Sequence, residues 1–170
     1  MRAVCLLLLG SFCIFASGEH SNRRAPGFAL PDPEYKHFYD LQDFRGKVVL
    51  IDIMATNCPH CMLLSTTLEQ VKQKYGDKVA ILSVVLPPDN QATVASYVAK
   101  NKITVPIVCD MGQMTISYLQ ASPSTSHIDV PHLFLIDKSG MIRNDFAYSE
   151  ADRNVFEGPE LYKEVEKLLK

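Results

Sequence analysis

Continuous apolar runs alternate with stretches of helical periodicity along this chain of 170 residues. Residues 47–54 and 79–86 are almost entirely apolar, which is typical of central strands covered on both faces. Between these runs, apolar side chains recur at helical spacing, at Cys61, Leu64, Leu68, Val71 and Tyr75. The pair Gly76-Asp77 then marks the end of a helix. The first half of the chain therefore predicts a strand, a helix and a second strand.

The second half continues the alternation and ends in a hairpin. Asp89 or Asn90 can cap a helix that runs to Lys102. We predict a strand at 105–109, a helix at 112–119, a loop at 120–127, two strands at 131–137 and 141–146, and a final helix at 159–170. This order predicts an α/β fold, a three-layer α/β/α sandwich with a mixed central sheet.

Composition is that of one ordinary globular domain, with 47% hydrophobic residues, 21% charged residues and a net charge of −2. We place this domain at residues 34–170, preceded by an extended segment at 19–33 whose Pro-rich part, 26–33, reads as a tether. No long basic run is present, so we expect no nucleic-acid partner.

Residues 1–18 read as a signal peptide, with one positive charge, an apolar stretch and the small residues Ala16-Ser17-Gly18. We expect an exported protein, periplasmic if the cell is Gram-negative, and anchored to the membrane only if this segment is not cleaved. Cleavage after Gly18 would remove Cys5 and Cys13. The mature chain would keep one possible disulfide pair and one further thiol.

The sequence Cys58-Pro59-His60-Cys61 follows the first strand and opens the first helix. Backbone N–H groups at a helix N-terminus stabilise a thiolate, so Cys58 is the expected nucleophile and Cys61 the resolving thiol of a redox-active disulfide. A charged His60 would add to this effect. A zinc site usually needs four ligands, and the chain has no second C-x-x-C, so we expect no metal and no bound cofactor.

Three motifs in order extend this pattern. They are residues 25–32 (APGFALPD), residues 43–51 (DFRGKVVLI) and the C-P-H-C sequence. Together with Val130-Pro131 they resemble the TlpA/ResA branch of the thioredoxin-like proteins, over residues 25–147. The resemblance implies a thioredoxin fold and a protein-disulfide oxidoreductase whose partners are cysteine-containing proteins and a redox partner protein.

Two further site assignments depend on this resemblance. Asp52 lies six residues before Cys58, the offset at which thioredoxins carry a buried acid, and a carboxylate there could handle the proton of Cys61. An aspartate on the other face of the strand, bonded to the backbone, is the alternative. Val130-Pro131 occupies the position of a cis-proline loop, which would expose the backbone of Val130 for binding a substrate segment.

Other features depart from the resemblance and bear on the direction of electron flow. The chain has no Trp, and Leu64 and His60 stand where reductants of the family often carry other residues. Because a stabilised thiolate makes the disulfide more oxidising, these features favour an oxidant, with a reductant of the cytochrome c maturation type as the alternative.

Two more functional classes remain as alternatives. A copper chaperone would pair the cysteines with His127 or His132. A peroxiredoxin-like peroxidase is disfavoured, because the chain lacks the expected P-x-x-x-T-x-x-C run. Cys109 is expected to pack as a small apolar residue, and His20 and His37 to be ordinary surface residues.

Overall fold

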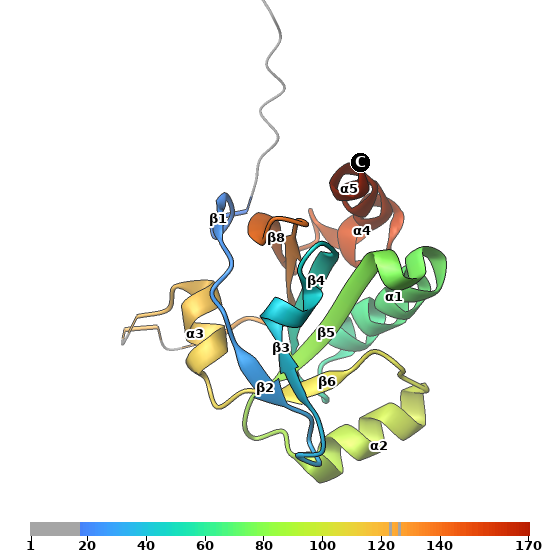
Figure 1. The fold of residues 1–170 in the computed structure, drawn as a ribbon. Coiled ribbons are helices and arrows are strands. Elements are labelled where there is room, and N and C mark those ends of the chain that lie inside the picture. The colour runs from blue at the N-terminus through green and yellow to red at the C-terminus, as the bar shows by residue number, and fades with distance from the viewer. Residues whose placement is uncertain (1–17, 123, 126) are drawn as a thin grey trace, which may run out of the picture.

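A computed structural model gives the fold of the chain and describes residues 18–122, 124–125 and 127–170 (Figure 1). The predicted signal peptide, with Cys5 and Cys13, lies outside the described residues except for Gly18.

A six-stranded mixed sheet forms the centre of the molecule. Its strands are β1 (Arg23–Arg24), β4 (Val48–Met54), β5 (Val79–Val85), β6 (Ile107–Cys109), β7 (His132–Ile136) and β8 (Met141–Ala147). They lie in the order β1-β8-β7-β4-β5-β6, with β4, β5 and β6 parallel and β7 antiparallel to β4. The predicted hairpin is confirmed as β7 and β8.

Helices cover both faces of this sheet, which confirms the predicted three layers (Figure 1). One apolar core lies under α1 (Pro59–Tyr75), α2 (Gln91–Asn101), α4 (Arg153–Phe156) and α5 (Pro159–Leu169). A second core lies under α3 (Gln113–Leu119). Because side chains alternate along a strand, Leu50 and Met54 belong to the first core, and Ile51 and Ile53 to the second.

The segment before the domain differs from our expectation of a tether. Strand β1 pairs with β8, and β2 (Ala29–Pro31) pairs with β3 (Phe38–Asp40), just before the 3-10 helix η1 (Leu41–Phe44). Ala25 is buried in the second core, and its N–H donates to the carbonyl of Gly140 at 2.9 Å. Backbone pairing and apolar burial thus hold this segment on the domain, although its proline content suggested a free linker.

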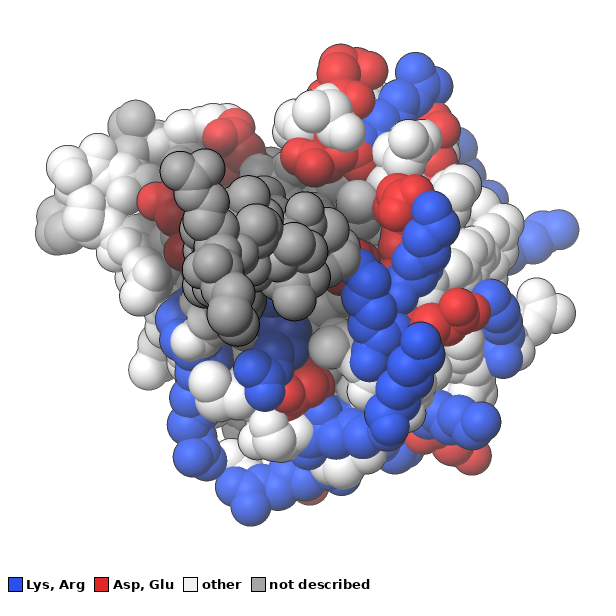
Figure 2. All heavy atoms as spheres, turned by 90° about the horizontal axis from the view of Figure 1, so that it is seen from above, with Lys and Arg blue, Asp and Glu red and all other residues white. Residues whose placement is uncertain are grey.

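The surface carries intermixed charges. On the face that Figure 2 shows, Lys and Arg side chains lie beside Asp and Glu side chains. Helix α5 supplies two such exposed pairs, Lys163 with Glu160 and Lys167 with Glu164. Exposed ion pairs of this kind contribute little to stability, so the two apolar cores provide most of the stabilisation of the fold. Among the described residues, no helix is long and apolar enough to cross a membrane.

Candidate functional site

Cys58 and Cys61 form a disulfide at the start of α1, with a Cα–Cα distance of 5.2 Å. Cys58 is the N-cap residue of α1, and its Sγ accepts a hydrogen bond from the backbone N–H of Cys61 at 3.1 Å. Cys58 is half-buried and Cys61 fully buried. A partner can therefore reach only Cys58, and its sulfur already lies among the N–H groups that stabilise a thiolate.

His60 lies exposed on the first turn of α1, between the two cysteines. Its ring stacks on Tyr148 at a centroid distance of 3.8 Å, with an angle of 21° between the planes. Tyr148 in turn packs edge-on against Phe156 of α4. No local pattern marks Tyr148 as a neighbour of the site, because this residue lies after β8, far along the chain from Cys58. The stack holds the imidazole at the surface, against Tyr148.

Asp52 is fully buried on β4, on the face that α1 covers. Neither carboxylate oxygen has a hydrogen-bond partner of good geometry among the described residues. Burial raises the pKa of Asp52 to about 8, and the neighbouring Ser83 of β5 lowers it only in part. The alternative of an aspartate on the other face of the strand, bonded to the backbone, does not describe this residue. A neutral carboxyl group therefore lies under the active-site helix at neutral pH.

Val130 and Pro131 lie opposite the disulfide, and the peptide bond between them is cis, as the resemblance implied. The carbonyl oxygen of Val130 is 3.7 Å from Sγ of Cys58. The loop before β7 therefore contacts the sulfur of Cys58 from the side opposite α1. The roles of Val130 and Pro131 in substrate binding, and of the cysteines in catalysis, stay predictions.

The loop before Cys58 is fixed by Asp89, a residue for which sequence reasoning proposed only helix capping. The carboxylate of Asp89 accepts hydrogen bonds from the backbone N–H of Thr56 at 2.9 Å, from the hydroxyl of Thr56, and from the hydroxyl of Thr93 at 2.8 Å. Asn90 is the N-cap of α2. Asp89 thus ties the active-site loop to the start of α2.

A shallow groove of about 580 Å³ lies beside Cys58, between α1 and α2. Asn57, Met62, Thr93 and Tyr97 contribute to its walls. The mixture of one exposed apolar side chain, Met62, with amide and hydroxyl groups suits contact with a polypeptide segment.

Cys109 is the free cysteine among the described residues, at the end of β6. Burial, with the charges of Asp32 and Asp89, raises the pKa of its thiol. It packs at the edge of the first core, in agreement with the expected structural role.

The two histidines proposed for a copper chaperone do not join the cysteines. His127 is exposed and pairs with Asp129. The ring of His132 bonds to Asp145, and both residues lie on the sheet face of the second core, next to Phe134. Among the described residues, no cluster of potential metal ligands includes Cys58 or Cys61.

Comparisons with known proteins agree with this geometry. Residues 22–145 match the AhpC/TSA family model. The chain is 29% identical to the thiol-disulfide oxidoreductase ResA of Geobacillus thermodenitrificans over 155 residues, which cover 84% of this chain and 83% of that protein. It is 27% identical to ResA of Bacillus thuringiensis over 71% of this chain, a stretch that spans 65% of that relative.

A solved structure gives the same fold. The thioredoxin domain of a thiol-disulfide oxidoreductase from Bacteroides vulgatus superposes with a TM-score of 0.68 at 21% identity. The superposition covers 88% of this chain and 98% of that domain. The expected thioredoxin-like fold is confirmed.

Proposed function

Because this chain belongs to the AhpC/TSA family, we propose that it is an exported enzyme that exchanges disulfides with protein substrates through Cys58 and Cys61. Its active site is that of a thiol–disulfide oxidoreductase of the thioredoxin fold. One observation carries the proposal: the half-buried Cys58 caps α1 with its sulfur 3.7 Å from the Val130 carbonyl, while Cys61 is inaccessible.

The proposed reaction starts when a substrate thiolate attacks Sγ of Cys58. A substrate–Cys58 disulfide forms, and the Cys58–Cys61 bond breaks with its electron pair on Cys61. A thiolate at the buried Cys61 is costly, so a proton donor is needed there, and the neutral carboxyl group of Asp52 can supply the proton. A second substrate thiolate then displaces Cys58, leaving an oxidised substrate and a reduced enzyme.

The half-buried backbone of Val130 next to the disulfide supports the choice of proteins as substrates. An extended segment could pair with the backbone of Val130 while its cysteine lies at Cys58, and the groove beside Met62 could take neighbouring side chains. The names of the ResA relatives are consistent with disulfide exchange.

Substrate trapping tests this proposal. In Cys61→Ser, the mixed disulfide at Cys58 cannot be resolved within the enzyme and should accumulate as an adduct with substrate proteins. Cys58→Ser should give no adduct, and Cys109→Ser should leave the yield unchanged. Adducts that persist in Cys58→Ser would contradict the assignment of the nucleophile. Fractionation of the native cells tests export separately.

The direction of electron flow is the finer part of the proposal. A protonated His60 on the first turn of α1 would stabilise the Cys58 thiolate and hence the dithiol form, so we favour an oxidant or isomerase over a reductant. The potential in glutathione buffers should be clearly less negative than about −270 mV, the value of thioredoxin. His60→Pro should lower it by roughly 40 mV, since about 30 mV corresponds to ~1.4 kcal/mol and a charge interaction of this kind is worth ~2 kcal/mol. A wild-type potential near that of thioredoxin would favour the reductant.

A further inference from the structure

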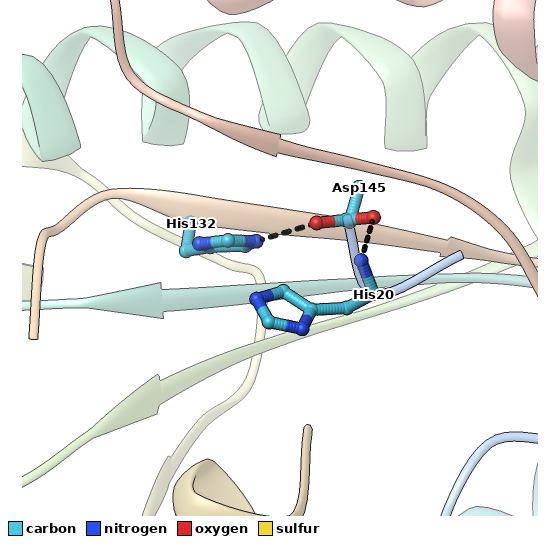
Figure 3. A group of neighbouring side chains, drawn as sticks. All are labelled: His20, His132 and Asp145. Atoms are coloured by element: carbon cyan, nitrogen blue, oxygen red, sulfur yellow. Dashed lines mark hydrogen bonds and ion pairs between the residues drawn. The ribbon is translucent and has the colours of Figure 1, made fainter. Parts of the chain in front are cut away.

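A cluster of two histidines and one aspartate lies on the opposite face of the sheet from α1 (Figure 3). His132 and Asp145 come from β7 and β8, and His20 comes from the segment before β1. One ring nitrogen of each histidine and one carboxylate oxygen of Asp145 lie within 4.8 Å of one another. From this geometry we propose that His20, His132 and Asp145 bind a divalent first-row transition-metal ion of the zinc class.

The sheet register brings the two strand residues together. Phe134 pairs with Asp145, and His132 pairs with Ala147, so His132 and Asp145 are diagonal neighbours on one face. Nε2 of His132 lies 3.1 Å from Oδ2 of Asp145. Two ligands of a tetrahedral zinc ion, each about 2.0–2.1 Å from the metal, lie roughly 3.3 Å apart, so this pair already has the required spacing.

His20 is held beside this pair by its own backbone. The N–H of His20 donates to Oδ1 of Asp145 at 3.0 Å, and the hydroxyl of Ser21 donates to the same oxygen at 2.7 Å. Oδ1 is therefore occupied by groups that orient the carboxylate, while Oδ2 faces the histidine. A metal-binding carboxylate commonly has this division between an orienting oxygen and a ligating one.

The ring of His20 has one nitrogen without a hydrogen-bond partner and turns the other toward His132 (Figure 3). Its Nδ1 is buried and has no hydrogen-bond partner among the described residues. A shift of at most about 1.5 Å would bring the ring to tetrahedral spacing with the other two ligands. His20 is only half-buried and lies in a segment without regular structure, so a side-chain rotation can provide this shift. His20 was expected to be an ordinary surface residue, and its contacts correct that expectation.

The donor set selects the class of ion. Two imidazoles and one carboxylate suit zinc, with a fourth position left for water, whereas calcium and magnesium prefer oxygen ligands alone. Phe134 stacks on the ring of His132 at 4.6 Å between centroids and fixes its orientation. Binding would replace the His132–Asp145 hydrogen bond and connect the N-terminal segment to the strand that follows Pro131. Cleavage after Gly18 would leave all three ligands in the mature chain.

Calorimetric titration with ZnCl₂ tests the site in the full chain, purified without a polyhistidine tag and kept in the disulfide form. With Cys58 and Cys61 oxidised, we expect one zinc ion per chain. His20→Ala should weaken binding roughly tenfold or more, since even groups that only orient a ligand contribute about that much to metal affinity. His20 is outside both apolar cores, so this variant should fold.

His37→Ala is the matched control, because His37 is exposed and belongs to no ligand cluster. It should bind zinc as the wild type does. Zinc should also raise the melting temperature of the wild type and of His37→Ala, but not that of His20→Ala.

Absence of zinc binding in the wild type would overturn the proposal and leave the cluster as a hydrogen-bonded pair. Equal affinity in wild type and His20→Ala, or loss of binding on blocking Cys109 alone, would overturn it as well. The site is separate from Cys58 and Cys61, so each of these results leaves the proposed disulfide exchange untouched.

Discussion

Asp52 and Asp145 are both buried in the same sheet, yet their environments are opposite. Asp52 faces α1, has no hydrogen-bond partner of good geometry among the described residues, and has a pKa raised to about 8 by burial. Asp145 faces the other way and accepts from the backbone of His20, from Ser21 and from His132. Although burial alone would raise it, these donors lower the pKa of Asp145.

The comparison shows that hydrogen-bond donors, more than depth, set the charge of a buried acid in this fold. The fold supplies donors where a fixed charge joins the N-terminal segment to β7 and β8. Under the active-site helix, hydrogen-bond donors of good geometry to Asp52 are lacking among the described residues, and a carboxyl group that can gain and lose a proton is useful there. The two aspartates should therefore respond oppositely to the same substitution.

The largest expected effect is on stability in Asp52→Asn. The raised pKa means that the folded state binds a proton that the unfolded state has released between about pH 4 and pH 8. Stability from this group is thus fully present below the unfolded pKa and falls as pH rises toward 8. Asp52→Asn should raise the free energy of unfolding at pH 7 by on the order of 4 kcal/mol. This pH lies about three units above the unfolded pKa, and each unit corresponds to about 1.4 kcal/mol.

Urea denaturation of both proteins across this pH range measures the effect. The gain should shrink toward zero as pH falls below about 4, where the carboxyl group is protonated in both states. A gain of the same size at pH 4 and pH 7 would show that packing, and not ionisation, explains it.

The same substitution at the other site should act in the opposite direction. Asp145→Asn removes a charge-assisted acceptor for His132 and turns a donor toward groups that also donate. We expect a loss of about 2 kcal/mol in the free energy of unfolding, measured at pH 7 in buffer with a chelator so that metal binding does not contribute. A stabilised Asp145→Asn would break the contrast between the two aspartates.

A smaller effect is expected on the kinetics of exchange. Asp52→Asn should slow the steps in which Cys61 gains or loses a proton, roughly tenfold, while attack at Cys58 keeps its rate. Stopped-flow measurement with a disulfide-bonded peptide separates the two steps, and Asp145→Asn is the matched control. Unchanged rates of resolution from about pH 6 to pH 9 would reduce Asp52 to a structural residue.

The sequence predicted the disulfide site but not the cluster of His20, His132 and Asp145. The apolar runs identified β4 and β5, and the C-x-x-C sequence placed Cys58 and Cys61 at the head of a helix. The resemblance to thioredoxin-like proteins added Asp52 beneath that helix. Asp52, Cys58 and Cys61 lie within ten residues of each other. The histidine cluster draws on residues more than a hundred positions apart, so no local pattern could reveal it.

The missed secondary structure has a similar cause. Strands β1, β2 and β3 have two or three residues each, and α4 has four, too few to show a period. Tertiary contacts, such as the burial of Ala25 and of Phe156, stabilise these short elements. The stack of His60 on Tyr148 depends in the same way on where α4 lies.

The central claim is that the thiol chemistry of this protein is concentrated at Cys58, and alkylation of the fully reduced protein tests it most directly. Iodoacetamide labelling at about pH 6, mapped by mass spectrometry, should modify Cys58 first, because the helix N-terminus stabilises its thiolate. Cys109 should react slowly, since burial and two nearby carboxylates raise the pKa of its thiol. Faster labelling of Cys109 than of Cys58 would contradict the account.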